Sequence, residues 1–196
     1  MKAVSTIPDG YREIYTVDLQ KDKKLALLIN GLAILIGVAL AVPMHFAVSI
    51  GTLFDMSQGY GAYFLRFGVL MASMIVYMIL HEAVHGIAMK MCGTKRVKYG
   101  YTGLYAFAGS EDYYDKASYI FIALAPVVLW GVVLLILQFF VPTSWFWVVY
   151  AVQISNLSGA AGDFFVTFRF SRFPKDILVR DSGVSMCVYS CAEEEK

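Results

Sequence analysis

Residues 78–86 read Met-Ile-Leu-His-Glu-Ala-Val-His-Gly, an H-E-x-x-H motif inside an otherwise apolar run. On a helix, His81 and His85 share one face because they are four residues apart. Two imidazoles at that spacing can bind one zinc ion, and Glu82 can act as general base for the attacking water. The alternative is a helix that carries these polar residues only for packing or pairing. Ionisable residues within a membrane are costly and usually functional, so we favour the metal site.

The composition is typical of a protein that crosses a membrane several times. Of the 196 residues, 59% are hydrophobic and 16% are charged, and the mean hydropathy is +0.63. At this length we expect a single domain over residues 1–196. The net charge of +1 gives no indication of a nucleic-acid partner. The odd number of cysteines implies no disulfide framework, and we predict reduced thiols at Cys92, Cys187 and Cys191.

Hydropathy predicts an all-α membrane protein with about four transmembrane helices, at residues 25–50, 62–91, 117–141 and 145–168. Each stretch exceeds the roughly 20 residues that a helix needs to cross the hydrocarbon core. A polar leader precedes the first span, and a short tail over residues 171–196 follows the last. Aromatic residues, glycines and partial alternation over Val97–Ala108 predict a short hairpin or loop between the second and third helices.

The basic residues predict the orientation in the membrane. They cluster before the first span, after the second and after the fourth. By the positive-inside rule, both termini and the hairpin or loop segment are therefore expected in the cytosol. All three cysteines then lie at or near a reducing compartment, which agrees with unpaired thiols.

A catalytic zinc ion usually has three protein ligands, so a third is needed beside the two histidines. The remaining histidine, His45, is predicted near the opposite end of the first span. Asp163 is an acid within the apolar fourth span. At about 1.5 Å per residue, His85, His81 and Asp163 lie roughly 7, 14 and 9 Å inside the cytosolic end of their helices. We therefore predict Asp163 as the third ligand. The alternatives are an Asp163 paired with Arg or Lys, and Cys92 as a ligand near the surface.

Asn156 lies on the same helical stripe as Asp163, because Asn156, Gly159, Ala160 and Asp163 are spaced i, i+3, i+4 and i+7. The residues between 158 and 162 are all small, which allows membrane helices to approach closely. Asn156 could hold a substrate backbone or an oxyanion. A hydrogen bond between helices is an equal alternative.

These residues resemble the DUF3267 family of zincin peptidases, small bacterial multi-span proteins that are related in outline to site-2 proteases. The matching stretches are His81–Gly86, Ala123–Pro126 and Ser158–Asp163, with further similarity over 8–11 and 174–183. The resemblance implies His81, His85 and Asp163 as zinc ligands and Glu82 as the base. Where site-2 proteases have Asn-x-x-Pro before Leu-Asp-Gly, this chain has Gly159 after Asn156 and no glycine after Asp163.

We therefore predict a zinc metallopeptidase of the cell membrane, embedded in the lipid bilayer, that hydrolyses membrane-anchored or membrane-proximal peptides. The resemblance implies a bacterial source. One alternative is a non-catalytic membrane scaffold, or a structural-metal protein that retains the motif. Another is a metal carrier, which would need several polar sites along a path, whereas the spans carry one cluster.

Overall fold

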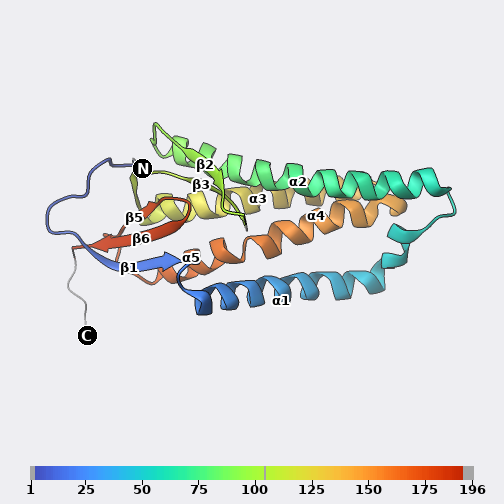
Figure 1. Cartoon of the computed structure of the whole chain (residues 1–196), viewed down its shortest axis with the longest axis horizontal. Helices are drawn as coiled ribbons and strands as arrows, with labels where there is room; N and C mark the ends of the chain where they lie inside the picture. The colour runs from blue at the N-terminus through green and yellow to red at the C-terminus, as the bar shows by residue number, and fades with distance from the viewer. Residues whose placement is uncertain (1–2, 104, 192–196) are drawn as a thin grey trace. The chain divides into compact units, whose positions relative to one another are not determined.

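The computed structural model describes residues 3–103 and 105–191, and Figure 1 shows the order of their helices and strands. The chain separates into two compact units, each assembled from discontinuous segments. The first combines Met1–Leu28, Glu82–Pro126 and Asp163–Lys196, and the second combines Ile29–His81 and Val127–Gly162. We call the first the sheet unit and the second the helical unit. Each is described on its own below.

The helical unit is built from apolar helices around a cluster formed by Leu53, Leu70, Trp147 and Val148. It takes in most of α1 (Lys23–Ala47), η1 (Ile50–Phe54), much of α2 (Tyr60–Met91), the C-terminal part of α3 (Lys116–Phe140), η2 (Thr143–Trp145) and α4 (Phe146–Gly159). Among the described residues, α1, α2 and α3 are long and apolar enough to cross a membrane. Their bounds agree with the first three predicted spans to within a few residues.

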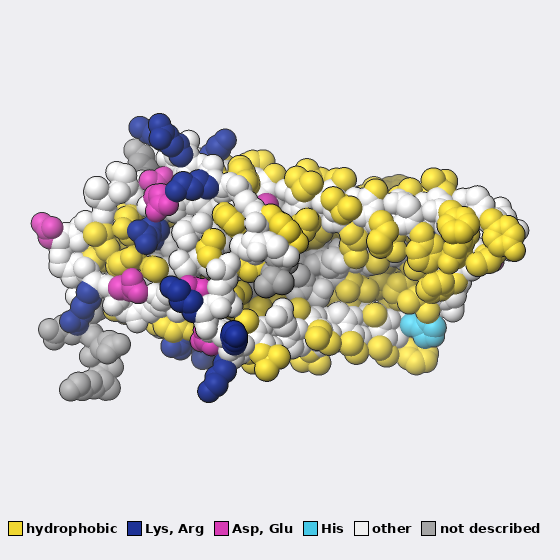
Figure 2. All heavy atoms as spheres, in the orientation of Figure 1, with side chains coloured by type: hydrophobic (Ala, Val, Ile, Leu, Met, Phe, Trp, Pro, Cys, Tyr) yellow, Lys and Arg dark blue, Asp and Glu magenta, His cyan; other side chains and the backbone are white. Residues whose placement is uncertain are grey.

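Charge separates the sequences of the two units. Arg66 and Asp55 are the charged residues of the helical unit, and all other Lys, Arg, Asp and Glu residues belong to the sheet unit. Arg66 is buried, and its guanidinium donates a hydrogen bond to the backbone carbonyl of Asp55. Figure 2 shows basic and acidic side chains gathered over the sheet unit and hydrophobic side chains over the helices. This distribution suits an apolar environment for the helical unit and water for the sheet unit.

The predicted fourth span is two helices rather than one. α4 ends at Gly159 and α5 (Ala161–Ser171) begins after Ala160, whose φ of −81° and ψ of 13° depart from the helix. α4 has 14 residues, or about 21 Å of helix, and α4 and α5 together cover most of the predicted span. Hydropathy counts apolar residues but does not detect where a helix breaks, so the prediction of one continuous helix over 145–168 was wrong.

The sheet unit corrects the all-α prediction. Four antiparallel strands form a sheet in the order β1-β6-β5-β4. Val17, Val179 and Val188 of three of these strands pack in one core with Val166 and Phe170 of α5. The bounds are Arg12–Asp18 for β1, Tyr113–Asp115 for β4, Leu178–Asp181 for β5 and Ser185–Ser190 for β6. Residues 192–196 of the predicted tail lie outside the described residues.

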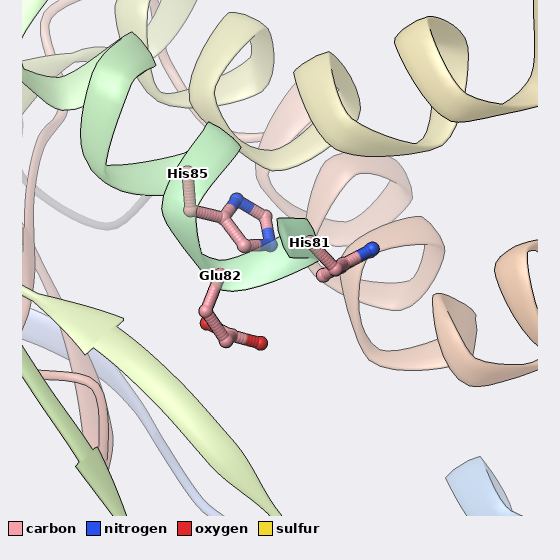
Figure 3. Close-up of side chains that lie close together, drawn as sticks. All are labelled: His81, Glu82 and His85. Atoms are coloured by element: carbon pink, nitrogen blue, oxygen red, sulfur yellow. The ribbon is translucent and has the colours of Figure 1, made fainter. Parts of the chain in front are cut away.

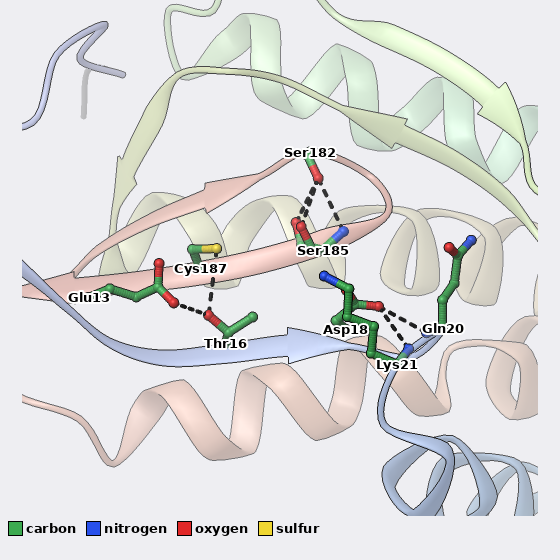
Figure 4. A network of polar contacts seen from close by, with 8 residues as sticks. All are labelled: Glu13, Thr16, Asp18, Gln20, Lys21, Ser182, Ser185 and Cys187. Atoms are coloured by element: carbon green, nitrogen blue, oxygen red, sulfur yellow. Dashed lines mark hydrogen bonds and ion pairs between the residues drawn. The ribbon is translucent and has the colours of Figure 1, made fainter.

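β1 pairs antiparallel with β6, and Figure 4 shows polar contacts on and beside these strands. The hydroxyl of Thr16 contacts the Glu13 carboxylate and the Cys187 sulfur. After β1, the Asp18 carboxylate accepts hydrogen bonds from the backbone amides of Gln20 and Lys21. The leader is thereby turned into α1. The sulfur of Cys187 is unpaired, as are those of Cys92 and Cys191, in agreement with the predicted reduced thiols.

Between α2 and α3, β2 (Lys98–Tyr101) and β3 (Ala106–Gly109) form an antiparallel pair. β3 is held against the turn between β5 and β6 by a close approach of backbones. A Cβ atom at Gly109 would overlap the backbone of Ser182, and one at Gly183 would overlap the ring of Phe107. Gly183 also has a φ of +84°, which glycine adopts without strain. Glycine at these two positions therefore fixes where β3 lies within the sheet unit.

Candidate metal centre

The H-E-x-x-H motif lies on one uninterrupted helix, α2. One ligand atom each of His81, Glu82 and His85 lies within 4.8 Å of the others. Figure 3 shows the three side chains projecting from neighbouring positions of this helix. His81 is buried, and the other two are partly buried. The helix therefore supplies two imidazoles and one carboxylate to a single place.

His85 is oriented by a backbone carbonyl. Its Nδ1 atom lies 2.9 Å from the carbonyl oxygen of Ile122 in α3. A carbonyl oxygen can only accept a hydrogen bond, so Nδ1 carries the proton. Nε2 is then the nitrogen with a lone pair for a metal ion. Such an outer partner is the usual arrangement for a histidine ligand.

Asp163 faces the same histidine. Its Oδ1 atom lies 3.7 Å from His85 Nε2, and both side chains are largely buried. Two ligand atoms at about 2 Å from a tetrahedral ion are roughly 3.3 Å apart, so a small movement would place both on one zinc ion. Asp163 lies in the first turn of α5, where the helix dipole favours a negative charge. The break after α4 thus gives the predicted third ligand a favourable position.

His81 is oriented through Tyr77, one turn earlier on α2. The Tyr77 hydroxyl lies 2.8 Å from His81 Nδ1 and donates a hydrogen bond of 2.9 Å to Asn156 Oδ1. The hydroxyl has one proton, which goes to Asn156, so it accepts the Nδ1 proton of His81. Nε2 is then the nitrogen of His81 that has a lone pair for a metal ion.

Asn156 is fully buried, and both ends of its amide are engaged within the helical unit. Its Nδ2 donates to the backbone carbonyl of Val127 at 3.1 Å, while its Oδ1 accepts from Tyr77. This arrangement matches the alternative of a hydrogen bond between helices. In this structure Asn156 thus contributes to packing and to the orientation of Tyr77, and its oxyanion role stays a prediction.

Glu82 lies near the hairpin. The backbone amide of Ala108 in β3 lies near its carboxylate. The placement of β3 by Gly109 and Gly183 therefore bears on where this carboxylate sits. Cys92, the alternative ligand, packs instead in the apolar core of the sheet unit with Met89. The structure gives Cys92 a packing environment rather than a ligand position.

Sequence reasoning missed a buried acid in the sheet unit. Asp181 of β5 accepts hydrogen bonds from the Tyr119 hydroxyl at 2.9 Å and the Gly183 amide at 2.8 Å. Burial raises the pKa of Asp181 above its ordinary value. In the sequence Asp181 sits in a polar turn, and nothing there signals its burial. The role of Tyr77 had a weak signal, since it precedes His81 by four residues on the same helical face.

The donor atoms fit zinc. The candidate donors are Nε2 of His81, Nε2 of His85 and a carboxylate oxygen of Asp163. Two histidines and one carboxylate form a ligand set that catalytic zinc sites use. Within residues 3–103 and 105–191, three helices are suited to a membrane, and a His-Glu-His group is suited to a metal ion.

The comparisons with known proteins identify the family. Residues 74–178 match DUF3267, described as "Putative zincin peptidase". This match covers more than half of the chain, so the chain belongs to that family, which confirms the resemblance seen in the sequence. An "Uncharacterized 24.7 kDa protein in gap 5'region" of Pyrococcus woesei is 30% identical over 125 residues, 60% of this chain and 53% of the relative. The chain thus spans about half of the relative's length. No solved structure matches.

Proposed function

We propose that the protein is a membrane-embedded zinc metallopeptidase with His81, His85 and Asp163 as ligands and Glu82 as general base. The observation that carries the proposal is the group of His81, Glu82 and His85 on α2, whose ligand atoms lie within 4.8 Å of one another. Membership of a zincin peptidase family supports the same chemistry. The Asp163 carboxylate near His85 completes a three-ligand set.

The chain's own residues have separate tasks in the proposed reaction. A bound zinc ion would polarise the scissile carbonyl and lower the pKa of the attacking water to about 7. Glu82 accepts the proton of that water and passes it to the leaving amine. His81 and His85 hold their ligand nitrogens in place through Tyr77 and Ile122.

The proposed substrate is a membrane-anchored or membrane-proximal peptide. Support comes from α2, which carries the motif and is itself long and apolar enough to cross a membrane. A peptide that reaches this helix must come from the bilayer or from its surface. Within α2, Glu82 and the residues after it belong to the sheet unit, which holds nearly all of the charged residues.

Metal content tests the proposed site most directly. We expect the purified protein to carry about one zinc ion per chain and the His81→Ala variant to lose most of it. His45→Ala is the matched control, because His45 accepts a hydrogen bond from the Ile50 amide elsewhere in the helical unit. Metal analysis of the three proteins, purified in detergent, gives the answer. A wild-type protein that binds no zinc would overturn the proposal.

We also propose that both termini and the β2–β3 hairpin are cytosolic. The basic residues cluster before the first predicted span, after the second and after the fourth. This distribution supports the orientation through the positive-inside rule. A reporter fused after Lys196 and one inserted near Gly109 are both expected to read cytosolic. An insertion in the loop at Ser57 and Gln58, between α1 and α2, is the control and should read external. An external signal at either of the first two sites would contradict the orientation.

A further inference from the structure

Tyr77 contacts His81 Nδ1, and Pro126 lies in α3 four residues after Ile122, whose carbonyl contacts His85 Nδ1. We propose that Tyr77 and Pro126 are positioning residues that hold His81 and His85 in the same tautomer, with the proton on Nδ1. The metal role of this tautomer rests on the proposed function. The tautomer itself can be measured in the metal-free protein, without any substrate.

The first arm is a chain of hydrogen bonds within the helical unit. The carbonyl of Val127 can only accept, so it fixes the Asn156 amide with its NH2 group toward Val127. Asn156 Oδ1 must then accept the single proton of the Tyr77 hydroxyl. The Tyr77 oxygen is left as an acceptor for His81 Nδ1–H. The direction of the whole chain is therefore set by one backbone carbonyl.

Burial makes this chain of hydrogen bonds effective. Asn156 is fully buried, and only 9% of His81 is exposed. A water molecule therefore cannot readily replace a lost partner, and an unsatisfied buried polar group is costly. We therefore expect that water does not replace the hydrogen bond lost on removal of the Tyr77 hydroxyl. The proton on the His81 ring should then change position.

The second arm lies within the sheet unit and depends on a missing amide proton. In an α-helix each N–H donates to the carbonyl four residues earlier. Pro126 in α3 has no N–H, so the carbonyl of Ile122 loses its usual donor, and the proline ring crowds that carbonyl. This is the carbonyl that accepts the Nδ1 proton of His85. A residue that ordinarily weakens a helix thus supplies the acceptor that orients a ligand.

The third histidine provides an internal reference. His45 Nδ1 accepts a hydrogen bond of 3.1 Å from the backbone amide of Ile50. An accepting Nδ1 has no proton, so neutral His45 carries its proton on Nε2. The chain has three histidines, and the structure gives His45 the tautomer opposite to that of the other two. Their ring nitrogens can therefore be distinguished in one spectrum.

Nitrogen NMR of the zinc-free protein labelled with 15N-histidine tests the proposal. Spectra are recorded at increasing alkaline pH until the histidine nitrogen signals no longer change with pH. In the wild type, we expect protonated Nδ1 for His81 and His85 and protonated Nε2 for His45. Tyr77→Phe should shift the proton distribution of His81 alone, and Pro126→Ala that of His85 alone. Each variant is thereby the control for the other.

Zinc affinity provides the second measurement. Each substitution should weaken zinc binding by about 10- to 100-fold, the usual effect of removing an outer partner of a histidine ligand. Tyr150→Phe is the matched control, because it removes a tyrosine hydroxyl that donates to the Leu40 carbonyl within the same unit. This variant should keep wild-type spectra and affinity. Alanine is a good helix former, so Pro126→Ala should remain folded.

Asn156→Leu is a further variant for the first arm. Without its acceptor, the Tyr77 hydroxyl can turn and donate to His81 Nδ1, which should move the histidine proton to Nε2. Wild-type spectra and zinc affinity in both Tyr77→Phe and Pro126→Ala would overturn the inference. A wild-type protein that binds zinc but cleaves no peptide would remove the peptidase proposal and leave the positioning roles intact.

Discussion

Glu82→Gln is expected to lower peptide cleavage by two to four orders of magnitude while zinc stays bound. The size of the loss follows from the task, because general acid–base catalysis contributes about 10²- to 10⁴-fold to a rate. Glutamine keeps the size and shape of the side chain. It cannot accept a proton from the attacking water. The expected result is therefore a folded, zinc-loaded and inactive protein.

The measurement compares Glu82→Gln with His85→Ala in cells that lack the native copy and in the purified proteins. A peptidase predicts that both variants fail to restore function, whereas only His85→Ala loses zinc. A scaffold or structural-metal protein predicts that Glu82→Gln behaves like the wild type. Glu111→Gln is the matched control, since Glu111 is exposed in the same unit and pairs with Lys98 at 2.8 Å. Wild-type function and wild-type zinc content in Glu82→Gln would contradict the peptidase proposal.

The part of the site that follows from local spacing could be predicted from the sequence. His81, Glu82 and His85 meet because a helix repeats every 3.6 residues, and no other part of the chain is needed for that. Asp163 required a further step, the counting of depth from the charged ends of two helices. That count was useful although the predicted helix is broken, because Asp163 lies on the α5 side, together with the Arg169 used as the reference point.

The remaining features depend on contacts that the sequence does not show. β1 is seven residues long and pairs with β6 across most of the chain, as Thr16 does with Cys187. A single short strand without a neighbouring partner gives little signal, so the sequence predicts only a polar leader there. The small residues before Asp163 were read as a surface for helix packing, whereas they also allow α4 to end at Gly159. Both features depend on tertiary packing, which overrides local pattern.

Asp163→Ala is expected to lower zinc affinity by more than about 100-fold, the upper end of what the loss of an outer partner costs. The reason is that a carboxylate 3.7 Å from His85 Nε2 is placed to share one ion with it. Asp163→Asn keeps the size of the side chain in the first turn of α5 and should also bind zinc poorly, because an amide carries no charge. Asp9→Ala removes an exposed acid of the same unit and should bind zinc like the wild type.

Competition with a calibrated chelator measures the affinity, and circular dichroism of the same samples checks that the helices persist. Full retention of zinc in both Asp163 variants would assign the third ligand elsewhere. The buried Asp181 would then be the first residue to test, because it belongs to the same unit and its carboxylate is already held by Tyr119 and Gly183. Loss of zinc in the Asp163 variants but not in Asp9→Ala would instead support Asp163 of α5 as the ligand that completes the two histidines of α2.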